Sequence, residues 1–449
     1  MKTERATAPA LVGQRTPIAS WSFTLPTETS LRRYDTTSSA PVAVGAPVIP
    51  RGAGRSYGDA AYVTDGVTLS SSGLRRILEL DEDAGTVRCE TGVEMGNLHK
   101  FLEGTDWSFP IFGGTQWATL GGAIASDIHG KNHVKEGSFG HHVAAIELLL
   151  GTGELVRCTP TENGDLFRAT IGGMGLTGFA KTVTLKLQRG RRSVVRLRSR
   201  TLTGVPAALD ALATSDDDFQ FVSCVKPGDP ASDIMIHPAA NYSDDPVPKA
   251  RKSVEIWLPT LPFKRLQLMH IGMSAFRGVQ LKLYGDVDRP AHIRSYNYIG
   301  LHEAIKNVNH VLGSFIEYQF VVPSGDLEHA WGELIRLAKA RGVTPRGYVF
   351  KRLGAQPGAG LLTFPYEGVT ASMFAGDTAE TRALFRHFTD ALIEMGGRVY
   401  LAKDSCISAD QLERMYGAQL TDWREIVARY DPDNAVQSDM SRRLAMKPW

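Results

Sequence analysis

The sequence has few cysteines and no long apolar run, and these absences exclude several classes of protein. The four cysteines among 449 residues form no Cys-x-x-Cys pair, which argues against a disulfide framework or a structural zinc site and indicates a reducing compartment. No run of about 18 apolar residues occurs, and residues 1–17 lack the apolar core of a signal peptide. We therefore expect a cytoplasmic protein that contacts a membrane at most peripherally.

A concentrated basic face is also absent. The formal net charge is only +2 at pH 7, and no basic patch is interleaved with aromatic residues, so we expect no nucleic-acid partner. The densest basic stretch, Arg189–Arg200, alternates arginine with valine and leucine. This spacing favours a strand with one solvated face over a phosphate- or membrane-binding segment.

The chain length of 449 residues exceeds what one hydrophobic core usually serves, so two domains are expected. The first forty residues are rich in Thr, Ser and Pro and are predicted to be irregular. From Pro41 to about Gln188, short β-like runs are separated by glycines. Their patterns predict hairpins over residues 77–92 and 144–158, a helix over 93–102 and a strand over 179–187.

The second half of the chain is less regular. Residues 226–251 contain several prolines and little periodicity, which predicts a long loop. The predicted strands cover residues 253–258, 279–285 and 315–323, and the predicted helices cover 327–341 and 380–395. The fold class is α+β, with an N-terminal domain over residues 1–188, an inserted domain over 189–396 and a C-terminal return over 397–449.

The most informative short stretch is RGAGRSYGD, residues 51–59, which we call the glycine loop. Its glycines Gly52, Gly54 and Gly58 are spaced one residue too widely for the dinucleotide fingerprint G-x-G-x-x-G, and no helical period follows. Glycines still let the backbone approach a ligand, successive N–H groups can bind an anion, and Arg51 and Arg55 add positive charge. An anion-binding loop and a plain turn between strands both fit this stretch alone.

Two further glycine-rich stretches, residues 113–142 and 164–185, favour a ligand. Gly121 and Gly122 suit a helix end close to a flat group or a phosphate. His129 and His133 are four residues apart, as metal ligands can be, but Gly130 weakens a helix there and no H-E-x-x-H glutamate is present. A polar binding loop is therefore preferred to a metal site. Three glycine-rich stretches at which the backbone can approach a ligand, without a Rossmann unit, indicate a long cofactor that lies extended along the domain.

Four segments, IPRGAGRSYGD, LGGAIASDIHGKNH, SFGHH and DLFRATIGGMGLTG, resemble the vanillyl-alcohol-oxidase type of FAD-binding flavoproteins. With EYQFVVP, YVFKRLG, GGRVYLAKDS and SDMSRRL, the chain is most similar to the oxidase subunit of the decaprenylphosphoryl-β-D-ribose 2′-epimerase family. The resemblance covers most of the chain from Pro50 and is weak over residues 1–49 and 200–295. It implies a two-domain FAD-binding (vanillyl-alcohol-oxidase/PCMH-type) fold with an inserted substrate domain built on an antiparallel sheet.

The resemblance also implies how FAD is held. In many relatives the position of Arg55 is a histidine bonded covalently to the flavin ring, and a guanidinium cannot supply that nucleophile. We therefore expect non-covalent FAD, with Arg55 serving the loop geometry or the pyrophosphate charge. The FAD contacts implied by the matching segments are Arg51, Gly52, Ala53, Gly54, Arg55, Ser56, Tyr57, Gly58, Asp59, Gly114, Thr115, Thr119, Gly121, Gly122, Ser126, Asp127, Ile128, His129, Asn132, Gly178, Phe179 and Tyr400.

Oxidation of a secondary alcohol requires hydride transfer to flavin N5 and an acceptor for the hydroxyl proton. Lys403 is the first candidate for binding the substrate oxygen, and burial beside a flavin would let its neutral amine act as the base. Lys351 is expected on a strand facing the flavin, and Gln319 near the substrate or the polar edge of the ring. His129 would bind phosphate or move a proton. Tyr400, on the other side of an extended segment from Lys403, would contact the flavin.

The expected substrate contacts are Glu317, Tyr318 and Lys131. Glu317 departs from the family, which has glutamine at this position, and it lies on the same strand face as Gln319. A carboxylate there would repel a phosphodiester-linked substrate and favour a neutral or cationic sugar, unless it is protonated or paired with a lysine.

These residues predict an FAD-dependent oxidase or dehydrogenase that converts a sugar secondary alcohol, of the ribose 2′-hydroxyl type, to a ketone. In an epimerase system a separate NAD(P)H-dependent short-chain reductase would be the partner. The expected substrate is either a sugar linked to a lipid phosphate or a soluble sugar, nucleoside or aminoglycoside-like intermediate. A more distant alternative is that the enzyme is an aldonolactone or alditol oxidase. From a different class, a non-catalytic flavin-binding partner protein is disfavoured by the presence of both Lys351 and Lys403.

Overall fold

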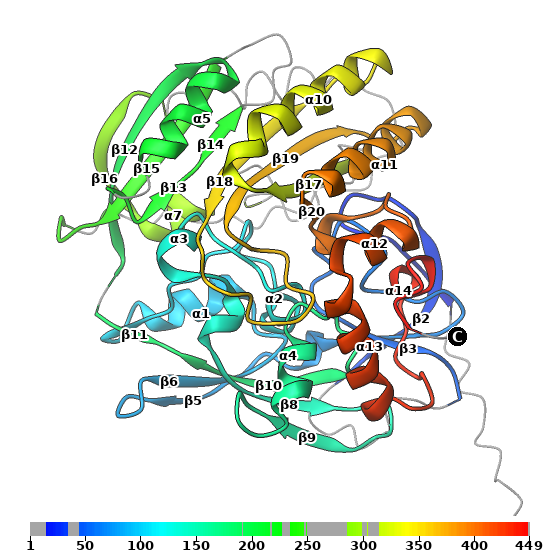
Figure 1. The fold of residues 1–449 in the computed structure, drawn as a ribbon. Helices are drawn as coiled ribbons and strands as arrows, with labels where there is room; N and C mark the ends of the chain where they lie inside the picture. Colours follow the sequence, from blue (N-terminus) through cyan, green and yellow to red (C-terminus); the bar gives the residue numbers. More distant parts are fainter. Residues whose placement is uncertain are drawn as a thin grey trace, which may run out of the picture.

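The described part of the chain contains three large sheets with helices packed against them and one small sheet of β7 (Trp107–Ser108) and β11 (Gln188–Arg189) (Figure 1). In this computed structural model it comprises residues 15–34, 45–190, 192–215, 218–226, 234–246, 248, 285–298, 303 and 314–447. The strand predicted over residues 253–258, and residues 279–284 of the next one, lie outside these ranges. Helices and antiparallel sheets occur together in one chain, so the predicted α+β class is confirmed.

The N-terminal sheet has the strand order β1-β2-β4-β3. Its strands are β1 (Arg15–Ile18), β2 (Thr27–Arg33), β3 (Val48–Arg51) and β4 (Val67–Ser70). β1 is antiparallel to β2, whereas β4 runs parallel to both β2 and β3. The prediction of an irregular N-terminus was therefore wrong for β1 and β2. Their residues are mostly polar and show no strand pattern, although their backbone groups are paired inside a sheet.

A second, antiparallel sheet has the order β5-β6-β10-β8-β9. Its strands are β5 (Ile77–Asp81), β6 (Thr86–Glu90), β8 (Val143–Leu149), β9 (Leu155–Cys158) and β10 (Phe179–Lys186), which confirms both predicted hairpins and the predicted strand. The helices beside it are α1 (Met95–Leu102), α2 (Leu120–Ser126) and α4 (Gly164–Thr170), and α1 lies in the predicted range. Apolar side chains of the sheet and these helices share one core.

The third sheet has nine strands in the described part of the chain, ordered β16-β12-β15-β14-β18-β19-β17-β20, with β13 paired to β15. All of its pairs are antiparallel. The strands are β12 (Val194–Thr203), β13 (Phe221–Val222), β14 (Cys224–Lys226), β15 (Ile234–Tyr242), β16 (Val287–His292), β17 (Phe315–Val322), β18 (Gly347–Leu353), β19 (Gly368–Gly376) and β20 (Arg398–Val399). β12 confirms the strand predicted for the arginine-rich stretch.

The loop predicted over residues 226–251 was wrong where β15 lies. Pro238 sits opposite Ser199 of β12, while on the other side β14 pairs at Ile236 and β13 pairs at Ala239 and Ala240. Pro238 thus falls at the break between β13 and β14, where the N–H that proline lacks is not needed for a ladder bond.

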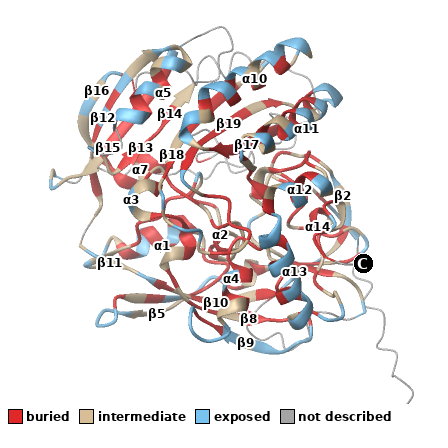
Figure 2. Ribbon diagram, in the orientation of Figure 1, coloured by how far each residue is buried: buried red, intermediate tan, exposed pale blue. Residues whose placement is uncertain are grey.

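The two faces of the large sheet have different neighbours. Helices α5 (Gly204–Ser215), α10 (Leu327–Ala340) and α11 (Ala379–Glu394) cover one face, and α10 and α11 occupy the predicted helical ranges (Figure 1). Beneath α10 and α11, Ile316, Tyr318 and Phe320 of β17 join the main core, and the outward sides of these helices are exposed (Figure 2). Because side chains alternate along a strand, Glu317 and Gln319 point from the opposite face, toward the rest of the molecule.

The C-terminal segment returns to the first two sheets. It contains η4 (Leu401–Lys403), α12 (Ala409–Tyr416), α13 (Ala418–Tyr430) and α14 (Asp439–Arg443), which lie beside β2, β3 and α4 (Figure 1). Val436 bridges to Val48, and the Trp423 indole donates to the Ala169 carbonyl at 2.9 Å. The bounds of the three predicted domains stay a prediction. In the described ranges, no helix is long and apolar enough to span a bilayer.

Candidate active site

Polar side chains gather on the face of the large sheet that α10 and α11 leave open. This polar strand face consists of Glu317, Gln319, Lys351, Thr370 and Ser372. The register places Gln319 opposite Ser372 and Lys351 opposite Thr370, so three adjacent strands contribute to it. All except half-buried Lys351 are buried. Buried polar groups in a sheet need partners, and those of this face come largely from one another and from the loops beneath.

Lys403 and Glu317 form an ion pair across this face. The Glu317 side chain is only 3% exposed and that of Lys403 21%, so the pair is largely shielded from water. The ammonium also lies 5.4 Å from the ring centre of Tyr57 in the glycine loop. Burial, and then the charge of Glu317, raise the pKa of Tyr57 well above its usual value, so its hydroxyl is a neutral donor next to that carboxylate. Of the alternatives left open for Glu317, pairing with a lysine is the one found.

The segment that carries Lys403 is a 3₁₀ turn, η4, and Tyr400 precedes it. The prediction of an extended segment, with Tyr400 and Lys403 on opposite sides, was therefore wrong. The turn is held where the Tyr400 N–H donates to the Gln319 carbonyl and the Lys403 N–H donates to the Tyr400 carbonyl, each at 2.9 Å. The Lys403 side chain consequently reaches Glu317 on the polar strand face, while the Tyr400 ring packs against His129 and Phe364.

Lys351 and Lys131 approach the same region from different elements. Burial lowers the pKa of each to about 7, and the positive charge of Lys351 contributes to the lowering at Lys131. Lys131 has partners for its ammonium, because Nζ donates to the Tyr296 carbonyl at 2.9 Å and lies 4.2 Å from the Tyr296 ring centre. Within the described ranges, no acceptor contacts Lys351 Nζ.

His129 connects the polar strand face to the loop after α2. The Gln319 amide donates to Thr370 Oγ1 at 2.9 Å and contacts His129 Nε2 at 3.0 Å. Because an amide nitrogen can only donate, His129 Nε2 accepts and the ring carries its proton on Nδ1. Burial, followed by the charges of Lys351, His133 and Lys403, holds the pKa of His129 well below its usual range. The neutral ring packs between Phe364 and Tyr400, 5.4 Å from each ring centre.

The loop that bears His129 is fixed from one side and open on the other. Asp127, at φ 41°, ends α2 and accepts hydrogen bonds from the Gly140 N–H at 2.8 Å and from the hydroxyls of Ser138 and Thr363. In contrast, three buried polar atoms of the same loop have no partner among the described residues: His129 Nδ1, Asn132 Oδ1 and His133 Nε2. Since buried polar atoms are normally paired, this loop fits a polar ligand lying along it.

The glycine loop is pressed against other parts of the chain. A Cβ on Gly58 would lie 1.7 Å from the Asp404 carbonyl oxygen, and one on Gly52 would lie 2.2 Å from Thr119 Oγ1. Gly54 has a φ of +65°, which favours glycine. Arg51 donates to the Ala19 and Ala61 carbonyls at 3.1 and 3.2 Å. These contacts show that the loop's own geometry requires its glycines and Arg51.

Arg55 stacks over the ring of Trp21, a residue that was not predicted to belong to the site. Its guanidinium carbon is 4.1 Å from the ring centre of Trp21, between β1 and β2. Burial lowers the pKa of Arg55, while the nearby carboxylates of Glu303 and Glu94 act in the opposite direction. The carbonyls of Ser56 and Tyr57 accept from the Trp21 N–H and the Ser22 hydroxyl at 2.8 and 2.7 Å. No spacing or motif in residues 15–34 signals this role.

Arg443 joins three distant segments and was also missed. It donates to both carboxylate oxygens of Asp59 at 2.7 and 2.8 Å and to the carboxylate of Asp404 at 2.9 Å. The glycine loop, the turn that bears Lys403 and the C-terminal helix α14 are thereby tied together. The only signal in the sequence was that SDMSRRL, which contains Arg443, belongs to the matching segments.

Other predicted residues lie in the hydrophobic cores. Tyr318 faces α11, stacked on Phe385 at 4.4 Å with its hydroxyl 2.7 Å from Thr389 Oγ1. It is not among the side chains that the structure brings together, because it occupies the opposite face of β17 from Glu317. Phe179 packs against Tyr34 at 4.7 Å.

The remaining predicted FAD contacts lie on the loops around α2 or at the start of β10. Thr119 caps α2 by accepting from the Gly122 N–H at 3.2 Å, and Gly121 packs against Thr91. The Ser126 carbonyl accepts from the Tyr400 hydroxyl at 2.9 Å. Their roles in FAD binding, and those of Ala53, Gly114, Thr115, Ile128 and Gly178, stay predictions.

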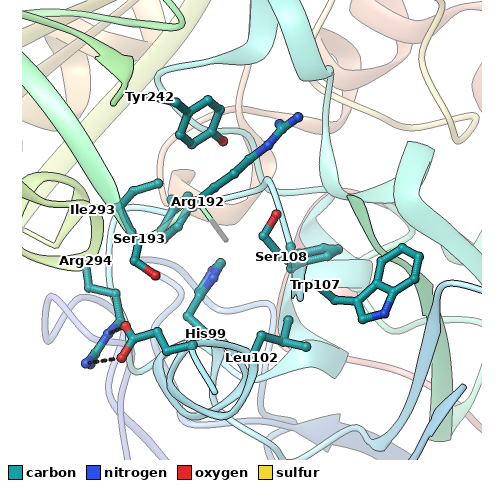
Figure 3. Close-up of a pocket in the computed structure, with 12 residues that line it drawn as sticks. His99, Leu102, Trp107, Ser108, Arg192, Ser193, Tyr242, Ile293 and Arg294 are labelled. Carbon is teal, nitrogen blue, oxygen red and sulfur yellow. Dashed lines mark hydrogen bonds and ion pairs between the residues drawn. The ribbon is translucent and has the colours of Figure 1, made fainter. Parts of the chain in front are cut away.

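A cleft elsewhere in the molecule contains none of the predicted residues. It has an empty volume of about 380 Å³ including its open mouth and is lined from α1, β7 (Trp107–Ser108), the segment before β12 and α7 (Ile293–Asn297) (Figure 3). Of its two arginines, Arg294 is paired with Glu103 at 2.5 Å and Arg192 lies 4.7 Å from the Tyr242 ring centre, and His99 is hydrogen-bonded to the Ile111 carbonyl at 3.1 Å. We place the chemistry at the polar strand face, where cations and unpaired polar atoms converge.

Comparison with known protein families agrees with this site. Residues 39–159 match the family model of an FAD binding domain, and residues 368–444 match that of D-arabinono-1,4-lactone oxidase. The first match contains the glycine loop and the His129 loop, and the second contains Thr370 and Lys403. The chain is therefore an FAD-dependent oxidoreductase that acts on CH–OH groups.

Whole-chain similarity is more specific. The chain is 30% identical over 427 residues to decaprenylphosphoryl-β-D-ribose oxidase of Mycolicibacterium smegmatis, covering 90% of both chains. It is also 30% identical to an uncharacterized protein of Streptomyces coelicolor, over 78% of this chain and all of that one. L-gulonolactone oxidase of Mus musculus is 28% identical over 38% of each chain. The chain belongs to the family of flavoprotein oxidoreductases that contains decaprenylphosphoryl-β-D-ribose oxidase.

The residues present fit FAD. The unpartnered atoms of His129, Asn132 and His133 lie in the segment matched by the FAD binding domain, and they offer both donors and acceptors to a long polar cofactor. Arg55 of the glycine loop stacks over Trp21 from the loop between β1 and β2. When bound, FAD supplies a two-electron acceptor for the hydride of the substrate.

Proposed function

We propose that this protein oxidises a secondary alcohol of a sugar, of the ribose 2′-hydroxyl type, to a ketone with non-covalently bound FAD. The observation that carries the proposal is the pair Lys403–Glu317 beside the unpartnered Lys351, on a strand face that contacts the His129 loop. The Lys403 ammonium can bind a substrate oxygen and stabilise the negative charge that develops as the hydroxyl proton leaves. Gln319 orients neutral His129, and the rings of Phe364 and Tyr400 exclude water around it.

The charge balance of the site bears on the substrate. Because Glu317 is paired with Lys403, its carboxylate is not an isolated negative charge, and Lys131, whose Nζ donates to the Tyr296 carbonyl, adds positive charge nearby. This supports a ribose-bearing substrate linked to a phosphate, as the name of the 30% identical relative describes for that protein. An enzyme of this type would be the oxidative half of an epimerisation, with an NAD(P)H-dependent short-chain reductase as its partner and at most peripheral membrane contact.

A soluble sugar or sugar-like intermediate is the second candidate. The match of residues 368–444 to the D-arabinono-1,4-lactone oxidase model favours it, because that segment holds Thr370, Tyr400 and Lys403. The two candidates differ in the substrate and share the chemistry.

The attachment of FAD gives the first prediction. Arg55 stacks over Trp21 and offers no nucleophilic nitrogen to the flavin ring. We expect acid precipitation of the purified yellow protein to release all of its flavin into the supernatant, where its absorbance is measured. Colour retained in the pellet would show that another side chain is bonded to the ring.

The reaction itself is tested by anaerobic bleaching of the flavin. We expect ribosyl phosphodiesters or free sugar alcohols to bleach the wild-type flavin, and Lys403→Ala to retain flavin but lower the bleaching rate by about 10²–10⁴-fold. The control Lys226→Met changes a lysine on β14 that packs on Tyr348. Unchanged bleaching by Lys403→Ala would remove Lys403 from the mechanism, and a protein that binds flavin but is bleached by no alcohol would be a non-catalytic partner.

A further inference from the structure

The two lysines of the polar strand face differ in what surrounds their amines. Lys403 is held in an ion pair against the carboxylate of Glu317. Lys351 is half-buried on β18 and, in the described part of the chain, has no acceptor for its N–H groups. The amine of Lys403 is therefore fixed by a partner, whereas that of Lys351 can turn its lone pair toward a substrate hydroxyl.

Charged and titratable groups from several elements surround the Lys351 amine. Burial lowers the pKa of Lys351 to about 7, the charge of Lys403 on η4 acts in the same direction, and Glu317 on β17 opposes both. From the loop after α2, Lys131 adds positive charge, whereas buried His129 and His133 are neutral because burial and nearby cations lower their pKa values. Burial lowers the pKa of Lys131 to about 7 as well, but its Nζ already donates to the Tyr296 carbonyl at 2.9 Å and lies over the Tyr296 ring, whereas Lys351 Nζ has no acceptor in the described part of the chain.

We infer that Lys351 is the base that accepts the hydroxyl proton, while Glu317 holds Lys403 in place to position the same substrate oxygen. The inference rests on the proposed function. The substrate O–H bond breaks and its proton passes to the lone pair of Lys351 Nζ, which becomes an ammonium. The C–H electron pair leaves as hydride to the flavin, the carbonyl forms, and Lys351 later returns the proton to solvent. Glu317 acts through Lys403 and is a positioning residue.

Lys351 as the base and Lys403 as the base predict opposite responses to substitution. If Lys351 is the base, bleaching rises with pH through about 7, because the amine must be neutral. In Lys403→Met this rise persists but moves to higher pH, because a cation that lowers the pKa of Lys351 is lost and Glu317 is left unpaired. In Lys351→Met the rise disappears and the rate falls about 10²–10⁴-fold. The reverse pattern would overturn the inference and make Lys403 the base.

A conservative variant distinguishes a role of Lys351 as proton acceptor from a role as positive charge alone. Lys351→Arg keeps the positive charge but cannot lose it at working pH, so we expect no rescue of the bleaching rate. If the role of Lys351 were only to attract or orient the substrate, Lys351→Arg would recover most of the rate, and the inference would fail. Flavin content and thermal unfolding of each variant confirm that it is folded, with Lys226→Met as the matched lysine control on the adjacent strand β14.

A substrate-free measurement decides the point independently of the proposed function. The lysines of the holoenzyme are reductively methylated with ¹³C-formaldehyde, which leaves the amines titratable, and the Lys351 signal is identified by its loss in Lys351→Arg. We expect this signal to titrate near neutrality. A Lys351 signal that titrates in the ordinary lysine range would overturn the inference. If no sugar alcohol bleached the flavin, the proposed function would fail, and this titration would still decide the state of Lys351.

Discussion

At the scale of single residues, a few long polar side chains determine how the site is held. The clearest case is Arg443, whose guanidinium binds Asp59 and Asp404 at 2.7–2.9 Å, with both carboxylates buried. Sequence reasoning identified the segment of each of these residues but not their contact, because a bond across 384 positions leaves no local pattern. In contrast, Lys351, Lys403, Gln319 and His129 were named from the sequence, and the structure brings them together.

Removal of Arg443 tests this link. We expect Arg443→Ala to lower the free energy of unfolding by about 3–5 kcal/mol, since two buried carboxylates lose their shared cation. Urea unfolding followed by fluorescence measures the change. Arg414→Ala is the control, because Arg414 pairs with Asp390 and Glu394 at the surface and its loss should be much smaller. Equal losses for the two variants would contradict a structural role for the Asp59–Arg443–Asp404 contact.

At the scale of elements, alternation along β17 separates a core face from a chemical face. That alternation could be predicted from the sequence, which is why Glu317 and Gln319 were correctly assigned to the same strand face. The conformation of residues 400–403 was not readable, because a single 3₁₀ turn has no period to detect. Strands β1 and β2 were missed because polar residues dominate them, and β15 was missed because Pro238 and the proline-rich flanks around it suggested a loop; tertiary pairing makes all three strands.

The contact between the glycine loop and η4 is tested by adding one methyl group. We expect Gly58→Ala to destabilise the protein by about 1–3 kcal/mol and to reduce its flavin content, because the Cβ would collide with the Asp404 carbonyl. Gly332→Ala, at an exposed position of α10 with nothing within 4 Å, should instead raise stability by about 0.5–1 kcal/mol. Urea unfolding and flavin absorbance report both effects. A Gly58→Ala protein with full flavin and stability would show that this close approach is not required.

At the scale of the whole molecule, the site forms where segments from all parts of the chain meet. The glycine loop comes from the first fifty-nine residues, the His129 loop from the second sheet, Glu317 and Lys351 from the large sheet, and Lys403 from the C-terminal return. The α+β class and the elements with a clear period, such as β5, β6, β8–β10, β17, α1, α10 and α11, could be predicted from periodicity, whereas α12, α13 and α14 were not. The convergence itself was predicted through the family resemblance, since periodicity describes segments and says nothing of which segments touch.

The central claim is that hydride leaves a sugar carbon bearing a secondary hydroxyl at this site. The most direct test compares anaerobic bleaching by a ribosyl substrate with that by the same substrate deuterated at C2′, using substrates deuterated at the other ring carbons as controls. We predict that bleaching slows only when C2′ carries deuterium, because that C–H bond breaks as the flavin is reduced. Bleaching that is insensitive to C2′ deuteration and slows with deuterium at another carbon would contradict the assigned position. If no sugar alcohol bleaches the flavin, the proposed oxidation itself is wrong.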